Sequence, residues 1–384
     1  MAAVRPMIAI TGIGTALPPY RMDQADTTRR IVDALSSNPD SARWARRIFK
    51  QCGVESRYTC EPELLLEASA CRYMPQEDRS KVPSTAERMA VYKRESVPLA
   101  LTAARAALAD AKIDAKQITH LITVSCTGQF LPGIDAALVQ ELGLVSSVMR
   151  IPLTFIGCAA GMKAICLSKQ LVSGDRNANV LIVCVELCTL HIQPSGDREA
   201  LFGASFFGDG ASACVIGAAS SQHQHVYQLG DDRSVLLPES ADEMIWEIGN
   251  DGFDLYLSPN IPRLIGDYVP AEAAHLGGDK PPELWAIHPG GKGIVEALQS
   301  KYGLRDEQVA PSLGVLRDIG NVSSATILFV MKKMREQLQE QGTERASGIA
   351  LAFGPGLTAE MINITYVASS VPSKRRTENA HYVS

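Results

Sequence analysis

The stretch FIGCAAGMKAICLSKQL, residues 155–171, contains the pattern that decides the fold. A glycine, one polar residue and several small residues are followed by an apolar segment of helical character. The stretch IGNVSSATILFVMKKM, residues 319–334, has the same plan. Such an internal repeat predicts two similar strand–helix units within one chain.

The spacing of these stretches from the preceding strands supports the repeat. Cys158 lies 32 residues after Cys126, which follows a buried strand, and Asn321 lies 33 residues after His288, which ends another. Two such units packed face to face would bring equivalent helix starts and strand ends toward one central site. We therefore expect these four side chains to lie near one another.

The wider pattern is that of an α/β protein, in which long apolar strands alternate with helical segments. A helix is predicted from Ser84 to Ala111, with Ser84 as its N-cap and Glu87 three residues further on. The strands are apolar throughout, which is typical of strands buried on both faces. They are Ile118–Ser125, Val180–Glu186, Leu284–Ile287 and Gly348–Phe353, and a first strand is expected in residues 1–18.

The composition is that of an ordinary globular protein, with 384 residues, 46% hydrophobic and 21% charged. A net charge of −5 argues against nucleic acid as a partner. No apolar run approaches the ~20 residues of a membrane-spanning helix, and the N-terminal apolar run is too short for a signal peptide. Nine cysteines without a CxxC pair support neither a disulfide framework nor a zinc site, so a cytoplasmic protein is expected.

Three residues carry the chemistry that the sequence suggests. Cys158 begins a helix, where the positive end of the helix dipole favours the thiolate. His288 ends a strand before Pro-Gly-Gly, at the edge where α/β proteins bind ligands. Asn321 is either a plain N-cap or a donor that stabilises a carbonyl oxygen together with His288. A buried inert cysteine and a core histidine are the alternative interpretations.

These motifs, in this order, resemble the type III polyketide synthases, the chalcone synthase-like family. The motifs are FIGCAAG, AIHPGGKGI, IGNVSSA, FFGDGASA at residues 206–213 and FGPGLT at residues 353–358. The resemblance covers about residue 7 to residue 366. It implies a thiolase-like five-layer αβαβα fold made of two similar halves, and a homodimer.

Residue roles follow from the resemblance position by position. It implies that Cys158 is the nucleophile and that His288 and Asn321 complete the triad. Further residues are expected to line or border the substrate cavity. They are Cys126, Thr127, Leu131, Phe207, Trp246, Leu255, Ser323, Gly354, Pro355 and Gly356, of which Leu131 is expected to reach into the partner's cavity and Phe207 to gate the coenzyme A tunnel.

We expect two domains and a tail. Residues 1–220 would carry the nucleophilic cysteine and residues 221–368 the histidine and asparagine, with a polar connection near Ala219–Asp232. Residues 369–384 are polar and expected to be disordered.

The implied reaction is decarboxylative condensation of malonyl-CoA with an acyl-CoA starter, followed by cyclisation. Coenzyme A thioesters would be substrates, with no bound cofactor, no metal and no acyl carrier protein. Arg47 matches a coenzyme A-contacting arginine of the family, and Lys50 lies on the same basic helix face. Two neighbouring basic positions of the family are Trp44 and Gln51 here, so the phosphate contacts differ.

Two other enzyme classes fit parts of the pattern. β-Ketoacyl carrier-protein synthases share the fold but usually follow the histidine with Gln-Ala-Asn, not with Pro289-Gly290-Gly291. A papain-like Cys-His-Asn hydrolase would be smaller and lack the second half. Alkylpyrone, alkylresorcinol and small phenolic products are all compatible with these residues.

Overall fold

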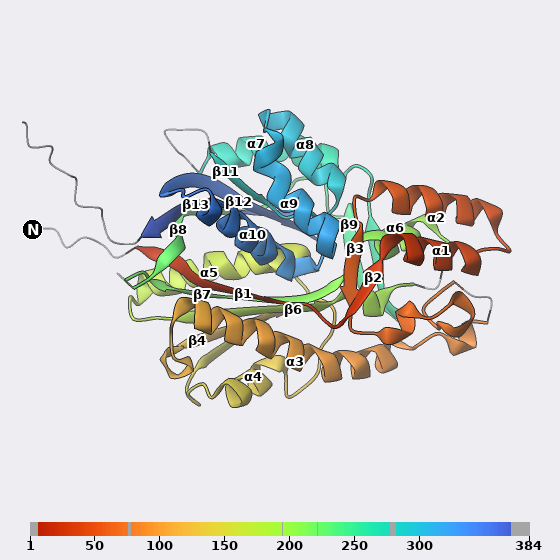
Figure 1. Ribbon diagram of the computed structural model, residues 1–384, viewed down its shortest axis with the longest axis horizontal. Helices are drawn as coiled ribbons and strands as arrows, with labels where there is room; N and C mark the ends of the chain where they lie inside the picture. The colour runs from red at the N-terminus through yellow and green to blue at the C-terminus, as the bar shows by residue number, and fades with distance from the viewer. Residues whose placement is uncertain (1–6, 76–77, 194, 221, 277–281, 370–384) are drawn as a thin grey trace, which may run out of the picture.

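The computed structural model describes residues 7–75, 78–193, 195–220, 222–276 and 282–369. Its elements form five layers, α–β–α–β–α (Figure 1). The expected disorder of residues 369–384 falls, apart from Ser369, outside the described residues.

The central layer consists of two helices, α5 (Ala160–Gly174) and α10 (Thr326–Glu340), between the two halves of the sheet (Figure 1). Each is preceded by one 3₁₀ turn, η5 (Gly157–Ala159) or η7 (Ser323–Ala325). The two turns pack against each other, and a Cβ on Gly161 would lie 2.2 Å from the Ser324 carbonyl oxygen. Small residues at the helix starts therefore allow the close approach that the repeat predicted.

Nine strands form one mixed sheet in the order β11-β12-β13-β8-β1-β7-β6-β4-β5. The two halves of the sheet join where β1 pairs with β8 over only two residue pairs, so the halves separate and enclose α5 and α10 (Figure 1). The strands are β1 (Ile8–Ala16), β4 (His120–Ser125), β5 (Met149–Thr154), β6 (Val180–Leu187), β7 (Asp209–Ala218), β8 (Gln224–Leu236), β11 (Leu284–Ile287), β12 (Arg345–Gly354) and β13 (Thr358–Ser369).

The two outer layers cover the outer faces of these half-sheets. One contains α3 (Thr85–Ala111) and α4 (Ile134–Leu142), which pack on β1, β4, β6 and β7. The other contains α7 (Ile261–Ala274), α8 (Lys292–Tyr302) and α9 (Asp306–Ile319), which pack on β11, β12 and β13. Of the helices that the structure describes, none has the length and apolar character to cross a bilayer.

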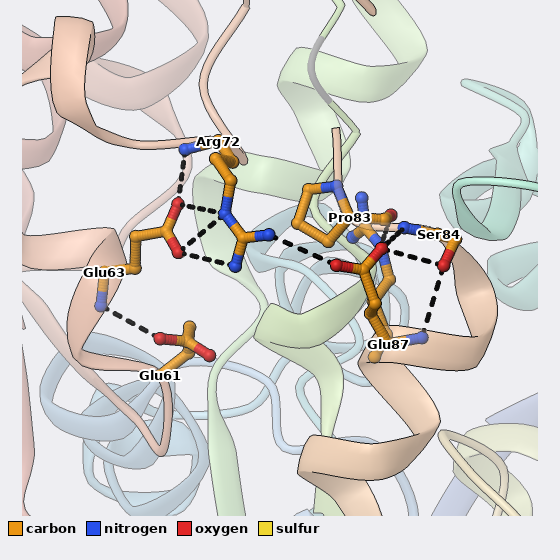
Figure 2. Close-up of polar contacts among 7 residues, drawn as sticks. Glu61, Glu63, Arg72, Pro83, Ser84 and Glu87 are labelled. Atoms are coloured by element: carbon orange, nitrogen blue, oxygen red, sulfur yellow. Dashed lines mark hydrogen bonds and ion pairs between the residues drawn. The ribbon is translucent and has the colours of Figure 1, made fainter. Parts of the chain in front are cut away.

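The start of α3 is fixed by a reciprocal cap. The Ser84 hydroxyl accepts the Glu87 backbone N–H at 3.3 Å, and the Glu87 carboxylate accepts the Ser84 N–H at 2.8 Å. Arg72 bridges Glu87 and Glu63 at 3.3 and 3.0 Å (Figure 2). This cluster ties the segment before α3 to the helix that carries Tyr92, whose ring packs against Gly128.

A smaller group of elements covers one end of the layered body (Figure 1). It contains the β2–β3 pair (Tyr20–Asp23, Ser56–Thr59), α1 (Gln24–Ala34), α2 (Pro39–Gln51) and α6 (Arg198–Phe206). A separate hairpin of β9 (Met244–Gly249) and β10 (Gly252–Leu257) also lies here. Of these elements, β9 and β10 supply residues that line the cavity described below.

The predicted elements are all present, with small differences at their ends, and one predicted connection is wrong. The α3 cap and the strands β6 and β11 lie where the sequence predicted them, β4 begins two residues later, and β12 begins three residues earlier. The predicted polar connection near Ala219–Asp232 is wrong over its second part, because β8 begins at Gln224 and pairs with both β1 and β13. Its polar residues flank the consecutive buried residues Val226 and Tyr227, so the segment lacks the strand alternation and forms a strand only through its tertiary pairing.

Candidate active site

The ends of β4, β11 and the starts of η5 and η7 enclose an apolar cavity of about 40 Å³. It brings together residues from both halves of the chain. Its lining is Cys126, Thr127, Gly157, Cys158, Cys188, Phe207, Met244, Trp246, Leu255, Leu257, His288, Gly290, Ile294, Asn321, Ser323, Phe353 and Pro355. The three proposed catalytic residues and most of the expected wall therefore share one enclosed space.

Cys158 lies in the 3₁₀ turn immediately before α5. As a residue Cys158 is half-buried, whereas the other eight cysteines are buried free thiols. The backbone reaches this position through Gly157 at φ +76°, where a Cβ would lie 2.3 Å from the Pro355 ring. Only glycine allows this close approach, so Gly157 sets the position of the thiol.

Burial raises the pKa of all three thiols that face the cavity. It raises the pKa of Cys158 to about 11, and hydrogen bonds from Ser323 and Asn321 act in the opposite direction. For Cys126 and Cys188 the nearby Glu186 carboxylate adds to the upward pKa shift that burial causes. Cys158 therefore needs a neighbouring base to act as a nucleophile near neutral pH.

His288 faces the cavity with both ring nitrogens unpaired. The side chain is fully buried, and neither Nδ1 nor Nε2 has a hydrogen-bond partner among the described residues. Its backbone is held by an N–H to the Leu351 carbonyl at 2.8 Å. Burial lowers the pKa of His288 to about 3, so the imidazole is neutral at physiological pH. A buried neutral imidazole without a structural partner is available to accept or donate a proton in the cavity.

Asn321 has a side chain whose orientation is fixed by its own turn. Its Oδ1 accepts the Ser323 backbone N–H at 2.8 Å and the Thr326 hydroxyl at 3.2 Å. These two donors leave Nδ2 directed toward Cys158 Sγ at 4.0 Å and the Gly290 carbonyl at 3.4 Å. The amide therefore presents N–H groups, not its oxygen, to the space beside the thiol.

The wall opposite these residues is held by a buried carboxylate. Glu186, at the end of β6, accepts the Cys126 backbone N–H at 3.1 Å and the Thr127 hydroxyl at 2.7 Å. The Ser324 hydroxyl donates to the same carboxylate, and Ser323 Oγ lies 3.2 Å from Cys126 Sγ. Burial raises the pKa of Glu186, and these donors offset part of that shift.

The sequence interpretation did not single out Glu186. The only indication was one carboxylate at the end of an otherwise apolar strand, VLIVCVE. The neighbouring lining residues Cys188, Met244 and Ile294 were also missed, because in sequence they look like ordinary core residues.

The β9–β10 hairpin supplies the aromatic part of the wall. Trp246 Nε1 donates to the Cys126 carbonyl at 2.7 Å, and its ring packs edge-on against His191 and Phe253. His191 Nε2 lies 2.7 Å from the Thr127 carbonyl, and its Nδ1 accepts the Phe253 N–H at 3.0 Å. Trp246 and His191 thus fix two consecutive carbonyls of the wall.

A second hollow of about 30 Å³ lies directly behind this aromatic wall. It shares Cys188, Phe207, Trp246 and Leu255 with the catalytic cavity. Trp246 and Leu255 therefore act as a partition between the two spaces.

Phe207 follows α6 and is clamped from two sides. Its carbonyl accepts Arg57 Nη1 at 3.0 Å, and its backbone bridges to Asn321. The Asn321 N–H donates to the Phe206 carbonyl at 2.8 Å. The Arg57 side chain itself is fully buried. Its Nε and Nη2 atoms have no hydrogen-bond partner among the described residues. Burial lowers the pKa of Arg57 to about 10, so the side chain stays charged at physiological pH. Arg57 fixes the segment that holds Asn321, a role that nothing in the sequence indicated.

The other expected residues lie at varying distances from the cavity. Pro355 lines it; Gly354 lies against Ala159, and Gly356 adopts φ +80° outside the lining. Leu131 is 92% exposed beside a separate hollow of about 460 Å³.

The two expected coenzyme A residues are both exposed on α2. Arg47 lies next to Trp44, and Lys50 borders a surface hollow with Lys292 and Arg317. Among the described residues, no group of three or more His, Cys, Asp or Glu side chains could hold a metal ion.

Comparisons with known proteins match nearly the whole chain. The model of the N-terminal domain of chalcone and stilbene synthases matches residues 2–220, and that of their C-terminal domain matches residues 228–368. The alpha-pyrone synthesis polyketide synthase-like Pks18 of Mycobacterium tuberculosis is 32% identical, covering 91% of this chain and 89% of the relative. Bisdemethoxycurcumin synthase of Oryza sativa subsp. japonica is also 32% identical, covering 92% and 91%.

Solved structures show the same similarity. PKS-I from the brown alga Ectocarpus siliculosus has a TM-score of 0.87 and 27% identity, covering 96% of this chain and 100% of that chain. The C-terminal type III polyketide synthase domain of Steely1, a type I/III hybrid from Dictyostelium, has a TM-score of 0.83 and 26% identity, covering 94% and 99%.

Proposed function

The chain belongs to the chalcone and stilbene synthases, the type III polyketide synthases, and on that premise we propose that Cys158, His288 and Asn321 perform its chemistry. The protein is an acyltransferase that joins an acyl-CoA starter to malonyl-CoA and cyclises the product. Matches to both domain models favour this activity over a β-ketoacyl carrier-protein synthase or a hydrolase.

Loading begins at Cys158. The thiol transfers its proton to the neutral His288 imidazole as Sγ attacks the starter thioester carbonyl. The carbon–sulfur bond to coenzyme A breaks, and coenzyme A leaves as its thiol after taking up the proton. The starter is then held as a thioester on Cys158.

Extension uses the donors around the same sulfur. The malonyl-CoA carboxylate leaves as carbon dioxide, and the electron pair of the broken carbon–carbon bond forms an enolate. His288 and the Asn321 Nδ2 group hydrogen-bond to the enolate oxygen, which gains negative charge. The enolate carbon attacks the acyl thioester on Cys158 and releases the Cys158 thiolate, leaving the lengthened chain on coenzyme A. The thiolate then attacks that thioester, the carbon–sulfur bond to coenzyme A breaks, and coenzyme A leaves as its thiol after taking up a proton.

One observation carries this proposal: His288, Asn321 and Cys158 line the same cavity. The His288 imidazole is buried and unpaired among the described residues, the Asn321 amide has a fixed N–H direction, and Cys158 is the one cysteine that is not fully buried. Structural histidines and asparagines satisfy their polar atoms, as His191 does. Neither ring nitrogen of His288 has a partner in the part of the chain that the structure describes, which is expected of a group that meets substrate.

Two finer assignments belong to the same proposal. An α-pyrone is the product class we propose, because Pks18 carries that activity in its name and the cavity is small. We also propose a homodimer in which the exposed Leu131 contacts the partner copy. Light scattering of the active protein at assay concentration tests the dimer, which an active monomer would contradict.

The activity is tested by incubating the purified protein with labelled malonyl-CoA and a panel of acyl-CoA starters, with products identified by mass. Cys158→Ala should form no polyketide and still release some carbon dioxide, because His288 and Asn321 remain. Cys166→Ala is the matched control and should retain condensation, because Cys166 is a buried cysteine on α5, the helix that follows Cys158. Full condensation by Cys158→Ala would refute the assignment of the nucleophile.

A further inference from the structure

A histidine behind the aromatic wall holds the β9–β10 hairpin against the layered body. His191 ends η6 (Cys188–His191), the 3₁₀ turn that follows β6. The residue is buried and lines the second hollow. The condensation steps described above do not use this side chain, although it is a buried group with two polar atoms.

The His191 imidazole is hydrogen-bonded at both nitrogens, to two different segments. Its Nδ1 accepts the Phe253 backbone N–H at 3.0 Å, so the neutral ring carries its proton on Nε2. Nε2 then donates to the Thr127 carbonyl at 2.7 Å. Burial lowers the pKa of His191 to about 3, which keeps the ring neutral at physiological pH. One side chain thus links β10 to the segment that follows β4, and Gln193 Nε2 adds a bond to the Phe253 carbonyl at 3.2 Å.

The same ring packs against both aromatic side chains on the inner face of the hairpin. It stacks on Phe253, with ring centres 4.0 Å apart and an angle of 14° between the planes. Trp246 meets it edge-on at 5.5 Å and meets Phe253 edge-on at 5.7 Å. Stacked and edge-to-face pairs hold rings in a fixed relation to one another. The position of the Trp246 indole therefore depends on His191.

Elsewhere the hairpin is attached to the body by its turn and its base. The Thr85 N–H donates to the Asn250 carbonyl at 2.8 Å, and the Gly252 N–H donates to the Thr85 hydroxyl at 2.9 Å. At the base, the Gly356 N–H donates to the Met244 carbonyl at 3.3 Å. In the part of the chain that the structure describes, the hairpin pairs with no other strand. Side-chain contacts therefore decide how closely its middle lies against the wall.

The middle of the hairpin separates two spaces. Trp246 and Leu255 are directly opposite each other on the two strands, and both border the catalytic cavity and the second hollow. These spaces have volumes of about 40 Å³ and about 30 Å³. An acyl chain that outgrows the first space can enter the second only where these two side chains move aside. A contact that holds Trp246 in place therefore limits the length of the chain.

We propose that His191 is a positioning residue that determines starter length. By holding Phe253 and the Thr127 carbonyl, it keeps Trp246 closed between the two spaces, so that short aliphatic acyl-CoA starters are accepted and long ones are excluded. This inference rests on the proposed function, since it presupposes acyl-CoA starters. It assigns selectivity to a residue that acts through Trp246 and not on the reacting atoms.

The test measures starter preference in the purified full-length protein. The readout is kcat/KM for octanoyl-CoA divided by kcat/KM for acetyl-CoA, at saturating malonyl-CoA. His191→Ala should raise this ratio at least about tenfold, because room for one more methylene in a hydrophobic site already changes selectivity by about that factor. A residue that only stabilised the fold would lower both values together and leave the ratio unchanged.

Two near-isosteric variants separate the two hydrogen bonds of His191. His191→Asn keeps an acceptor for the Phe253 N–H, whereas His191→Gln keeps a donor for the Thr127 carbonyl. Because the bond to the hairpin is the one that holds Trp246, His191→Gln should raise the ratio nearly as far as His191→Ala, and His191→Asn should raise it less. Hydrogen exchange of the Phe253 amide, which needs no activity, should be faster in His191→Gln than in His191→Asn.

A double variant and a control complete the design. In the Trp246→Gly variant, adding His191→Ala should change the ratio no further, because His191 acts through Trp246. His225 offers the matched control: its ring also stacks on an aromatic ring, that of Tyr366, and its Nδ1 lies 2.7 Å from the Tyr366 hydroxyl. It lies on β8, outside the described lining of both spaces, so His225→Ala should keep the wild-type ratio.

The outcomes separate this inference from the function beneath it. If wild type makes polyketide and a folded His191→Ala keeps the wild-type ratio, the inference is wrong and the function stands. A wild type that already prefers octanoyl-CoA, or an additive effect in the double variant, would also overturn it. If His191→Ala does not fold, the order of His191→Asn and His191→Gln decides, and the reverse of the expected order contradicts the inference. If wild type makes no product from any starter, the proposed function itself fails.

Discussion

Replacing His288 with glutamine removes the base beside Cys158, so the reactivity of the Cys158 thiol should fall. Burial raises the pKa of this thiol to about 11. At pH 7 the thiolate fraction would then be 10^(7−11), or about 10⁻⁴. In the wild type the neutral imidazole can take the proton as Sγ attacks, a form of help that typically contributes on the order of 10²–10⁴ in rate.

The expected result is a change in both the rate and the pH dependence of alkylation. His288→Gln should react with iodoacetamide at least about 100-fold more slowly than wild type at pH 7. Because a raised thiol pKa keeps the reactive form scarce below that pKa, the variant rate should rise about tenfold for each pH unit between 7 and 10.

Mass spectrometry of tryptic peptides measures this directly. Cleavage after Lys163 and Lys169 places the buried Cys166 in the peptide adjoining that of Cys158, where it serves as an internal control. A variant alkylated at the wild-type rate, with no pH dependence between 7 and 9, would refute the reasoning. The start of α5, not His288, would then be the main source of thiolate.

Three other changes test the wall and its supports. Asn321→Ala should slow malonyl-CoA decarboxylation by about 10²–10³ and starter loading by less, because the lost N–H donor serves the enolate; normal decarboxylation with failed loading would contradict this role. Trp246→Gly should join the catalytic cavity to the adjoining hollow and admit longer starters or an extra extension, so an unchanged product profile in a folded variant would remove Trp246 from the site. Arg57→Met should lower kcat about tenfold through loosened placement of Asn321 and Phe207, with Arg57→Lys recovering part of the loss and thermal melts as the stability control.

The sequence predicted those features of the fold that depend on local pattern. Continuous apolar runs identify β6 and β11 because strands buried on both faces need no alternation. The repeated helix starts at Gly157 and Gly320 place Cys158 and Asn321 together, because both turns need small residues to pack closely.

Features set by contacts between distant segments were not predictable. β8 was missed because its polar residues are accommodated only by pairing with β1 and β13. Arg57 lies 150 residues along the chain from the carbonyl that it holds, so no local pattern reveals this contact. Burial likewise decides the thiol acidity: the helix start alone favours thiolate, yet desolvation outweighs it.

The division of the cavity between two kinds of element has a consequence for how such enzymes diversify. Cys158, His288 and Asn321 belong to the layered body, where η5 and η7 press against each other and tolerate little change. Trp246 and Leu255 belong to a two-stranded hairpin that pairs with no other strand among the described residues. Mutations in that hairpin can alter which molecule is made while the bond-forming step is inherited unchanged. Exchanging residues 244–257 between relatives would therefore be an economical way to evolve new products in the laboratory.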